Sequence, residues 1–439
     1  MAGGTVLRVL ATAGLLLIQG AGCKGKTQVS AAGPAGSVSA AAPAAVCTDP
    51  DAQSCLERAQ ELELGSHGRS MDKQAAIALY RAACDRKVAE ACAFLGQLYF
   101  VGEGSLKEDN VQAARLFEQA CDGGSALGCA DSGAALGSGL DGVPMDKVKG
   151  QAAYDKALSL HKANCEKADA LECTALGFVY ESGIGALPSN KQLASSTFTQ
   201  VFKLAQAGCD KQDNAACNLL GYVYLNGKGD QVVDKTKAMT LFERACAGND
   251  ADACLNVGEG HEFGFNAGAK DLTKALAFYD KGCSMGNGDA CHHAASLYLA
   301  AGPLHDAKKG VASLQAGCDR KSAAACNDLG VVFVDGQDLP KDLHRGVAAY
   351  RRGCRLGNAT ACDNFKYMNG KVEGEQATTE FRKSLKTGSD SHCGLVIEVK
   401  EPIAKVQTMI GEVWLKIEQL YPKGQANCRF VNGVYQDPH

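Results

Sequence analysis

Cysteines are the reactive side chains that recur most regularly in this sequence. Nine pairs have seven residues between their two members, and successive pairs begin 35 to 44 residues apart. The pairs are Cys47/Cys55, Cys84/Cys92, Cys121/Cys129, Cys165/Cys173, Cys209/Cys217, Cys246/Cys254, Cys283/Cys291, Cys318/Cys326 and Cys354/Cys362. Self-similarity at such a period indicates a repeat architecture, which takes precedence over the separate globular domains that 439 residues would otherwise suggest.

Thiols in pairs can bind metal, carry out redox chemistry or form disulfides. Zinc sites and redox enzymes use Cys-x-x-Cys spacings, which these pairs lack. In a continuous helix the two cysteines would lie about 12 Å apart, beyond the roughly 7 Å that a disulfide spans. However, the intervening residues, as in CAGNDADAC from Cys246 to Cys254, are turn formers. We therefore predict disulfides that clamp the end of one helix to the start of the next.

The residues around each pair predict those two helices. Aspartate stands twelve residues before the first cysteine in six units, where it would cap a helix N-terminus. Small and large apolar residues follow on one helical face. After the second cysteine come leucine, glycine, an aromatic residue and a second glycine, as in Leu95, Gly96, Tyr99 and Gly102. The first glycine would allow close helix approach and the second would end the helix.

Each unit is therefore expected to be a helical hairpin, and the stacked units an all-α, right-handed α-solenoid. The motif Asp…Ala-x3-Tyr/Phe…Cys-x7-Cys-x2-Leu-Gly-x2-Tyr-x2-Gly resembles the SEL-like repeats of the tetratricopeptide-like class, especially the Helicobacter cysteine-rich branch. The resemblance covers residues 47–370. The two 44-residue units depart from it, with insertions expected near residues 138–150 and 183–196, and Ala205 replaces an aromatic residue. Phe365-Lys366 replaces Leu-Gly in the last unit, which suits a capping repeat.

Resemblance to the cysteine-rich branch implies penicillin binding or weak β-lactam hydrolysis. Serine enzymes with this activity need a Ser-x-x-Lys pair, in which the lysine helps to activate the serine. Ser70 with Lys73 and Ser159 with Lys162 match that spacing, and Lys386-Thr387-Gly388 mimics a further element, but the Ser-Asp-Asn between them is missing. A chain this rich in serine and lysine gives such pairs by chance. We therefore predict no catalytic residue and keep a β-lactam-binding or weakly hydrolysing β-lactamase-like protein as the alternative function.

The histidines indicate no metal site. His261-Glu262 and His292-His293 lack the His-Glu-x-x-His register of zinc hydrolases, and a solvated or hydrogen-bonded role is expected. The glycines follow the repeat rather than forming a phosphate loop, and we expect no cofactor. With a formal charge of −4 and no basic stripe, we expect no nucleic-acid partner.

The first 46 residues predict export. Arg8 and the apolar run Val9 to Ile18 resemble a signal peptide, and Gly20-Ala21-Gly22-Cys23 resembles a bacterial lipoprotein cleavage site, so residues 1–23 are expected to end at a lipidated Cys23. Residues 24–46 are rich in Ala, Gly, Ser and Pro and predict a flexible linker. No later segment is long and apolar enough to span a bilayer. The expected location is the outer membrane or the periplasm, with cell-surface exposure left open.

The last part of the chain lacks the helical repeat pattern and instead predicts short strands. Residues 371–390 predict a connecting helix or linker, and residues 391–439 predict short strands that form a small β domain or a cap. This segment looks similar to small bacterial Src-homology-type barrels, in which Cys393 and Cys428 would form a tenth disulfide. Such a barrel implies binding of peptide or cell-wall glycopeptide. Trp414, the only tryptophan, would be either a core residue or a ligand platform.

Together these features predict a monomeric, exported and lipid-anchored scaffold rather than an enzyme. Its partner would be a protein or peptide of the bacterial cell envelope, bound on the helical surface as α-solenoids generally do. The C-terminal segment adds peptidoglycan as a further partner. Contact with the membrane is expected only through the lipid on Cys23.

Overall fold

A computed structural model describes residues 52–66, 69–265, 268, 270–336, 340–408, 411–431 and 434–436. Two compact units divide the chain between Cys362 and Asp363. The first is helical throughout, and the second contains most of helix α18 and all of the strands. Within the described residues, no helix is both long enough and apolar enough to cross a membrane.

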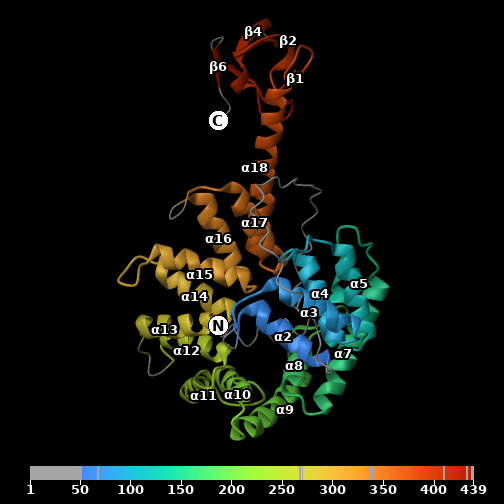
Figure 1. The fold of residues 1–439 in the computed structure, drawn as a ribbon, viewed down its shortest axis with the longest axis vertical. Helices are drawn as coiled ribbons and strands as arrows, with labels where there is room; N and C mark the ends of the chain where they lie inside the picture. Colours follow the sequence, from blue (N-terminus) through green and yellow to red (C-terminus); the bar gives the residue numbers. More distant parts are fainter. Residues whose placement is uncertain are drawn as a thin grey trace. The chain divides into compact units, whose positions relative to one another are not determined.

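The first unit is a succession of antiparallel helical hairpins, as the repeat predicted (Figure 1). Most of its helices have thirteen residues. The helices are α2 (Ala52–Leu64), α3 (Lys73–Asp85), α4 (Ala89–Val101), α5 (Asn110–Asp122), α6 (Ala126–Ser138), α7 (Lys147–Glu166), α8 (Ala170–Ser182), α9 (Lys191–Asp210), α10 (Asn214–Asn226), α11 (Lys235–Ala247), α12 (Ala251–Phe263), α13 (Leu272–Ser284), α14 (Gly288–Leu299), α15 (Ala307–Asp319), α16 (Ala323–Asp335), α17 (Leu343–Arg355) and α18 (Ala359–Lys383).

Helix caps begin these helices where the sequence predicted them. In all six predicted units the aspartate side chain accepts a hydrogen bond from a backbone N–H in the first turn of the helix; the residues are Asp72, Asp109, Asp234, Asp271, Asp306 and Asp342. Asp146 and Asn190 make the same bond in the two long units. These bonds satisfy backbone donors that an uncapped helix would leave unpaired.

The insertions of the long units lie inside helices, which corrects the prediction that placed them near residues 138–150 and 183–196. The loop before α7 covers 139–146 and that before α9 covers 183–190, eight residues each, the same as 102–109 before α5. Instead α7 and α9 have 20 residues where the other helices have 13. The difference of seven residues is close to two full turns, so the helix keeps the same face toward its neighbours.

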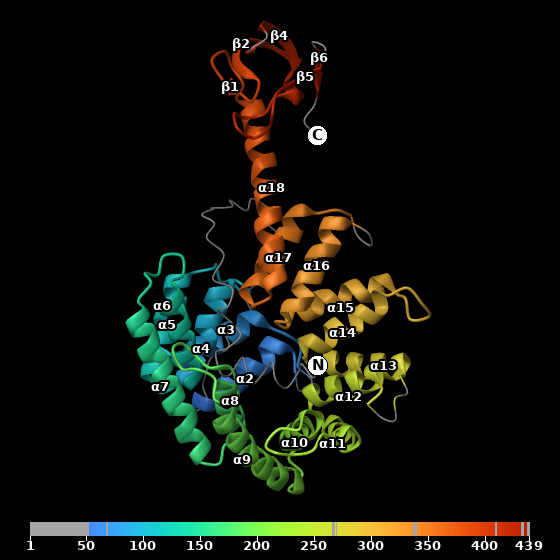
Figure 2. The same cartoon turned by 180° about the vertical axis from the view of Figure 1, so that it is seen from behind.

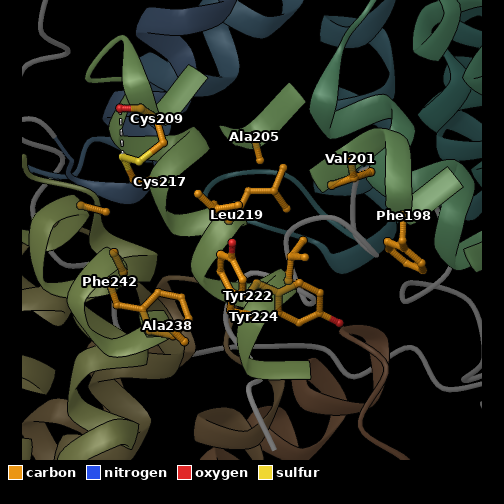
Figure 3. Packing of buried hydrophobic residues seen from close by; sticks show 14 of the residues in the cluster. Phe198, Val201, Ala205, Cys209, Cys217, Leu219, Tyr222, Tyr224, Ala238 and Phe242 are labelled. Atoms are coloured by element: carbon orange, nitrogen blue, oxygen red, sulfur yellow. Dashed lines mark hydrogen bonds between the residues drawn. A yellow bond between two sulfur atoms is a disulfide. The ribbon is translucent and has the colours of Figure 1, made fainter. Parts of the chain in front are cut away.

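The glycine of each Leu-Gly pair lets an aromatic ring of the next helix pack against the backbone. A Cβ atom on Gly96 would lie 2.7 Å from the ring of Phe117, and one on Gly177 would lie 2.9 Å from Phe198. Phe198 therefore supplies the aromatic ring that Ala205 lacks, from a position seven residues earlier in α9. The predicted close approach at these glycines is confirmed, and Figure 3 shows Phe198 in the resulting apolar core.

Disulfides join each hairpin of the first unit to the next. The described bonds are Cys84–Cys92, Cys121–Cys129, Cys165–Cys173, Cys209–Cys217, Cys246–Cys254, Cys283–Cys291, Cys318–Cys326 and Cys354–Cys362. Their Cα atoms are 4.2 to 4.7 Å apart, because the chain turns between the two cysteines. Cys55 is also disulfide-bonded. Its predicted partner Cys47 and the predicted lipidation site Cys23 lie outside the described residues.

The second unit contains a small antiparallel sheet. Strands β1 (Asp390–Ser391), β2 (Gly394–Lys400), β3 (Ile403–Thr408) and β4 (Gly411–Lys416) pair in that order, followed by the short helix η1 (Ile417–Gln419). Strands β5 (Arg429–Val431) and β6 (Val434–Gln436) form a separate hairpin. Val396, Val406 and Leu415 are buried in the core of this unit, and the disulfide Cys393–Cys428 ties the turn before β2 to the segment before β5. Closure into a barrel stays a prediction.

Candidate functional site

The two ends of the solenoid meet. Figures 1 and 2 show the helices of the first unit following a curve, so that α17 returns beside α4, and contacts between α4 and α17 bear this out. On α17, the Arg355 guanidinium donates a 3.0 Å hydrogen bond to Asn110 of α5 and pairs with Glu108, which also pairs with Arg351. Arg355 and Asn110 are 245 residues apart in the sequence.

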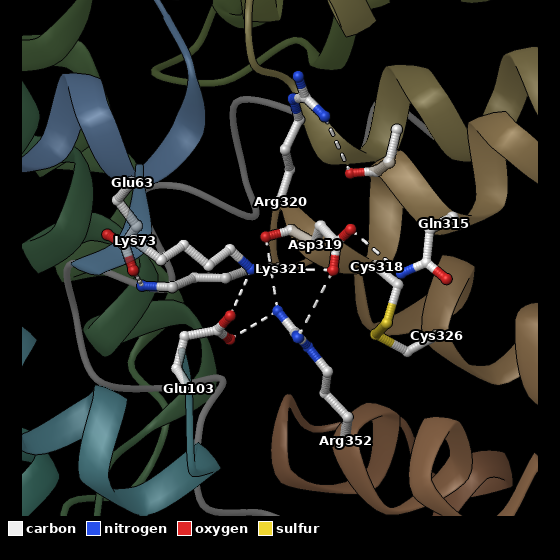
Figure 4. A network of polar contacts seen from close by, with 11 residues as sticks. Glu63, Lys73, Glu103, Gln315, Cys318, Asp319, Arg320, Lys321, Cys326 and Arg352 are labelled. Atoms are coloured by element: carbon white, nitrogen blue, oxygen red, sulfur yellow. Dashed lines mark hydrogen bonds and ion pairs between the residues drawn. A yellow bond between two sulfur atoms is a disulfide. The ribbon is translucent and has the colours of Figure 1, made fainter. Parts of the chain in front are cut away.

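A second group of charges joins the same two ends (Figure 4). Arg352 Nη2 lies 2.6 Å from Glu103 Oε2, and Glu103 also pairs with Lys73. Asp319, at the end of α15, lies 3.8 Å from both Lys73 and Arg352. Lys321 Nζ lies 2.5 Å from Glu63 of α2. We call these contacts the seam; it is formed by Glu63, Lys73, Glu103, Glu108 and Asn110 with Asp319, Lys321, Arg351, Arg352 and Arg355.

The seam holds ionised groups in places that water barely reaches. The Glu103 side chain is 2% exposed. Burial opposes its ionisation, but the Arg352 and Lys73 cations outweigh burial and lower the pKa of Glu103 below its usual value. Burial and the neighbouring Arg352 lower the pKa of Lys73, which Glu103 opposes. Glu103 is therefore kept ionised partly by Arg352, which comes from the other end of the solenoid.

Lys321 occupies a backbone conformation that normally favours glycine. Its φ is +65°, as at the matching turn residues Lys87 and Asn249, whereas Gly286 and Gly357 serve in the neighbouring turns. The left-handed region is unfavourable for a lysine by about 1 kcal/mol. In return, Lys321 reaches Glu63, whose other oxygen accepts a 2.8 Å hydrogen bond from the Tyr80 hydroxyl.

Behind the seam lies a cavity of about 1360 Å³, which we call the α2 cavity. One wall is α2 with part of α4, and the other is formed by the turns of four successive cysteine pairs. Those turns contribute residues 249–252, 284–289, 320–324 and 356–358. Glu63, Glu103 and Lys321 belong both to the seam and to the cavity wall.

The lining of the α2 cavity combines apolar and acidic groups. Leu64, Phe94, Met285 and Leu356 supply apolar surface. The acidic side chains outnumber the basic ones; they are Glu57, Glu61, Glu63, Glu103, Asp250, Asp252 and Asp289, against Arg320 and Lys321. Burial raises the pKa of Asp289 above its ordinary value. Small-molecule pockets are typically about 300–1,000 Å³, so this cavity has room for several side chains of a polypeptide.

The structure does not assemble a serine nucleophile at either Ser-x-x-Lys pair. Lys73 is engaged in the seam with Glu103 and Asp319. The Ser159 hydroxyl donates to the Asp155 carbonyl, while Lys162 lies over the ring of Tyr180. Lys386-Thr387-Gly388 belongs to the second unit. The β-lactam alternative therefore gains no support from the geometry.

His292 and His293 are held by acidic side chains, in the hydrogen-bonded role that was expected for them, whereas His261 stacks on the ring of Phe278. His292 lies 2.8 Å from Asp328, and His293 lies between Glu259 and Glu262 at 3.8 and 3.7 Å. A further residue, His161, is buried against Glu172 at 2.5 Å. In this way α12, α14 and α16 are linked by polar contacts on top of their apolar packing.

One group of side chains among the described residues has metal-ligand proximity: His392, Cys393 and Cys428. Metal binding by cysteine requires the thiolate, and both of these cysteines are consumed in their mutual disulfide. His392 instead lies 3.1 Å from the Tyr435 hydroxyl. We assign the group a structural role.

A scan of protein families matches the repeats directly. The profile described as Sel1 repeat fits residues 52–88, 89–125, 173–194, 214–250, 251–287 and 323–358. The chain belongs to the Sel1-repeat family. The repeat boundaries at 88/89 and 250/251 fall between paired cysteines, so Cys84–Cys92 and Cys246–Cys254 each join one Sel1 repeat to the next. Membership of the cysteine-rich branch stays a prediction.

Solved structures with similarity to this Sel1-repeat chain include proteins of the same class. The protective antigen c5321 of uropathogenic Escherichia coli, described as an SLR fold, is 20% identical over 75% of this chain and 72% of its own, with a TM-score of 0.37. A Sel1 repeat protein of Oxalobacter formigenes is 21% identical over 72% and 86%, with a TM-score of 0.36. The immunity protein Pa5087 of Pseudomonas aeruginosa is 15% identical over 50% and 74%, with a TM-score of 0.32. A sequence search of curated proteins gave no significant match.

Proposed function

We propose that this Sel1-repeat protein is an exported, lipid-anchored scaffold that binds a protein or peptide partner of the bacterial cell envelope in its α2 cavity. Sel1 repeats generally mediate protein–protein interaction. The observation that carries the proposal is the cavity itself, which exceeds a small-molecule pocket and combines apolar with acidic lining. Its lining favours a segment with apolar and basic side chains.

The disulfides support a location outside the cytoplasm. Such bonds persist in oxidising compartments and are rare where thiols are kept reduced. Nine lie among the described residues, far more than an occasional redox pair would require. The lipid anchor on Cys23 and the linker 24–46 would then hold the scaffold near a membrane surface.

Site-specific photo-cross-linking in cells tests the binding site. A photoreactive residue replaces Gln60, which lines the cavity, or Glu118, which is exposed on α5 away from it. We expect the Gln60 position to give a discrete cross-linked protein that the Glu118 position does not. Equal cross-linking from both positions would contradict binding in the cavity.

Lipidation needs a separate test. Cells fed an alkyne fatty acid should label the wild-type chain and not Cys23→Ala, and only the wild type should fractionate with membranes. Label retained by Cys23→Ala would overturn the anchor and leave the cavity proposal intact.

The second unit supports a second binding function, toward peptidoglycan. Trp414 is 40% exposed and so lies outside the core, which supports the role of a ligand platform. Lys400 and Lys405 lie 5.4 and 6.0 Å from its ring, so the sheet presents an aromatic surface between cations. Co-sedimentation with purified peptidoglycan should be lost in Trp414→Ala and kept in Tyr367→Ala, an exposed aromatic residue of α18. Equal sedimentation of both variants would exclude this role.

A further inference from the structure

The seam differs from every other junction between hairpins in the first unit. Elsewhere, successive hairpins are linked by the continuous chain and by a disulfide, as at Cys84–Cys92 and Cys318–Cys326. At the seam neither link is available, because its two sides are opposite ends of the solenoid. Opening of the first unit would therefore begin at the seam, where noncovalent contacts alone hold it.

The seam is also chemically different from those junctions. Successive hairpins pack through small apolar residues, as Gly128 of α6 does against Ala120 of α5. The seam is formed mainly by ion pairs. Val101 packs against the apolar cluster of Leu314 and Phe333, and Leu64 lies beside Gly286. An apolar junction loses hydrophobic free energy when it opens, whereas ions that separate regain hydration.

Desolvation of a buried ion pair nearly cancels its Coulomb attraction, so closure of such a seam is only weakly favourable. At Glu103 both effects act, since burial disfavours its charge and Arg352 with Lys73 outweigh burial. The exposed members are weakened further by salt; the side chain of Arg351 is 45% exposed. Closure of the seam is therefore opposed by desolvation and weakened by salt.

We propose that the seam is a clasp that opens to admit a partner to the α2 cavity and closes behind it. Glu63, Glu103 and Lys321 form part of the cavity wall as well as the seam, so separating them widens the cavity. The inference rests on the proposed function for what enters the cavity. Opening itself is a property of the isolated chain and is tested without any partner.

The test measures the distance across the seam. Keto-bearing residues at Glu118 and His344, both exposed, carry spin labels for electron double resonance, which avoids the cysteines. In wild type at low salt we expect one short distance. In 1 M salt, or in Glu103→Gln/Glu108→Gln, we expect a second population at longer distance. A variant that combines Glu103→Arg with Arg352→Glu keeps opposite charges at this pair. It should therefore show more of the short distance than Glu103→Arg alone.

The matched control is Glu181→Gln, which removes an ion pair with Lys228 between hairpins that a disulfide also joins. We expect it to keep the single short distance. Helicity measured by circular dichroism identifies variants that fail to fold. If Glu103→Gln/Glu108→Gln fails to fold, the salt series on wild type and the milder variant Arg351→Gln test the opening instead. A single short distance in all folded variants and at all salt concentrations would overturn the clasp, as would equal lengthening in Glu181→Gln.

Access to the cavity is followed by methionine oxidation. Met285 lines the α2 cavity, and Met145 is 58% exposed elsewhere and serves as the internal standard. Relative to Met145, oxidation of Met285 should be several-fold faster in Glu103→Gln/Glu108→Gln than in wild type. An unchanged ratio, in a variant whose labels show the long distance, would mean that the seam opens without widening the cavity and would overturn the gating step.

Discussion

Arg355 and Glu108 form an ion pair although 247 residues separate them in the sequence. Arg355 also lies over the ring of Phe100, with its guanidinium carbon 4.6 Å from the ring centre. The pair joins the last helices of the solenoid to the first, so the repeats form a closed circuit in the first unit. This closure creates the α2 cavity and gives the molecule an inside that an open solenoid lacks.

Two lysines in the same backbone conformation should respond oppositely to glycine. Lys87 and Lys321 have φ of 71° and 65° at equivalent turns. Lys87 is exposed, and Lys87→Gly should stabilise the protein by up to about 1 kcal/mol because it removes an unfavourable backbone conformation. Lys321→Gly should destabilise, because Glu63 is left buried without its cation. Denaturant unfolding measures both, and stabilisation by Lys321→Gly would contradict a role for Lys321 in the seam.

Gly96 should tolerate no side chain. A Cβ would lie 2.7 Å from the Phe117 ring, and overpacking of this kind destabilises by about 1–3 kcal/mol. Gly137, in α6, has no atom within 4 Å of its Cβ position, so Gly137→Ala should be neutral or stabilising through helix propensity. Thermal unfolding of Gly96→Ala and Gly137→Ala compares the two. If both shift Tm alike, the packing explanation of the Leu-Gly motif is wrong.

Removing one clamp should loosen its own hairpins most. Replacing both Cys246 and Cys254 with serine removes a short-loop disulfide that contributes about 2–3 kcal/mol in the chain-entropy treatment. Hydrogen exchange should rise in α11 and α12 and stay near wild type in the distant α5 and α6, because solenoid repeats contact mainly their neighbours. Uniformly raised exchange would instead indicate that the first unit unfolds as one cooperative body.

Asp131 should make stability depend on pH. Burial raises the pKa of Asp131 to about 7, although Gln97 donates a 2.9 Å hydrogen bond to it. Because the folded state favours the protonated acid, its contribution is full below the unfolded pKa near 4 and is lost as pH rises toward 7. Asp131→Asn should therefore be more stable than wild type at pH 8, with the difference shrinking toward pH 4. Unfolding at the two pH values checks it, and a constant difference would rule out titration of Asp131.

His293 should act in a different pH window. Burial opposes its charge, but Glu262, Glu259 and Asp289 raise the pKa of His293 above its usual value. The stabilisation is therefore fully present below the unfolded pKa near 6.5 and is lost as pH rises through the folded value. Stability measured between pH 6 and 9 should fall in wild type and change less in His293→Gln. Parallel curves for the two proteins would mean that His293 does not titrate in this range.

The hairpins could be predicted from the sequence because their signals are local and repeated. Asp72 as a cap, Gly96 as a contact point and Cys84–Cys92 as a clamp each act within one or two neighbouring units. The extra residues in α7 and α9 were not predicted there because Ala205 occupies the expected aromatic position, and the aromatic residue, Phe198, stands seven residues earlier. An aromatic residue displaced by a whole number of turns was the available signal.

The seam could not be predicted in this way. The curvature of a solenoid is the sum of small rotations at every junction between repeats. The residues near Glu108 or Arg355 in the sequence do not indicate this total rotation, so they do not predict that the two ends meet. A charged residue on a helix surface is ordinarily solvated, and only the closed circuit turns these into partners. The exposed position of Trp414 was likewise undecidable from one sequence, because β4 has two faces and each accommodates an aromatic ring.

Closure also constrains how this protein can change over generations. An open solenoid accepts another repeat at either end, and its length drifts by duplication and loss. Here an added or deleted hairpin would rotate Arg352 and Arg355 away from Glu103 and Glu108. The ion pairs between these residues would then be lost. The number of repeats is therefore fixed by geometry, and variation is left to changes that preserve the angle turned by each hairpin, such as the two extra turns within α7 and α9.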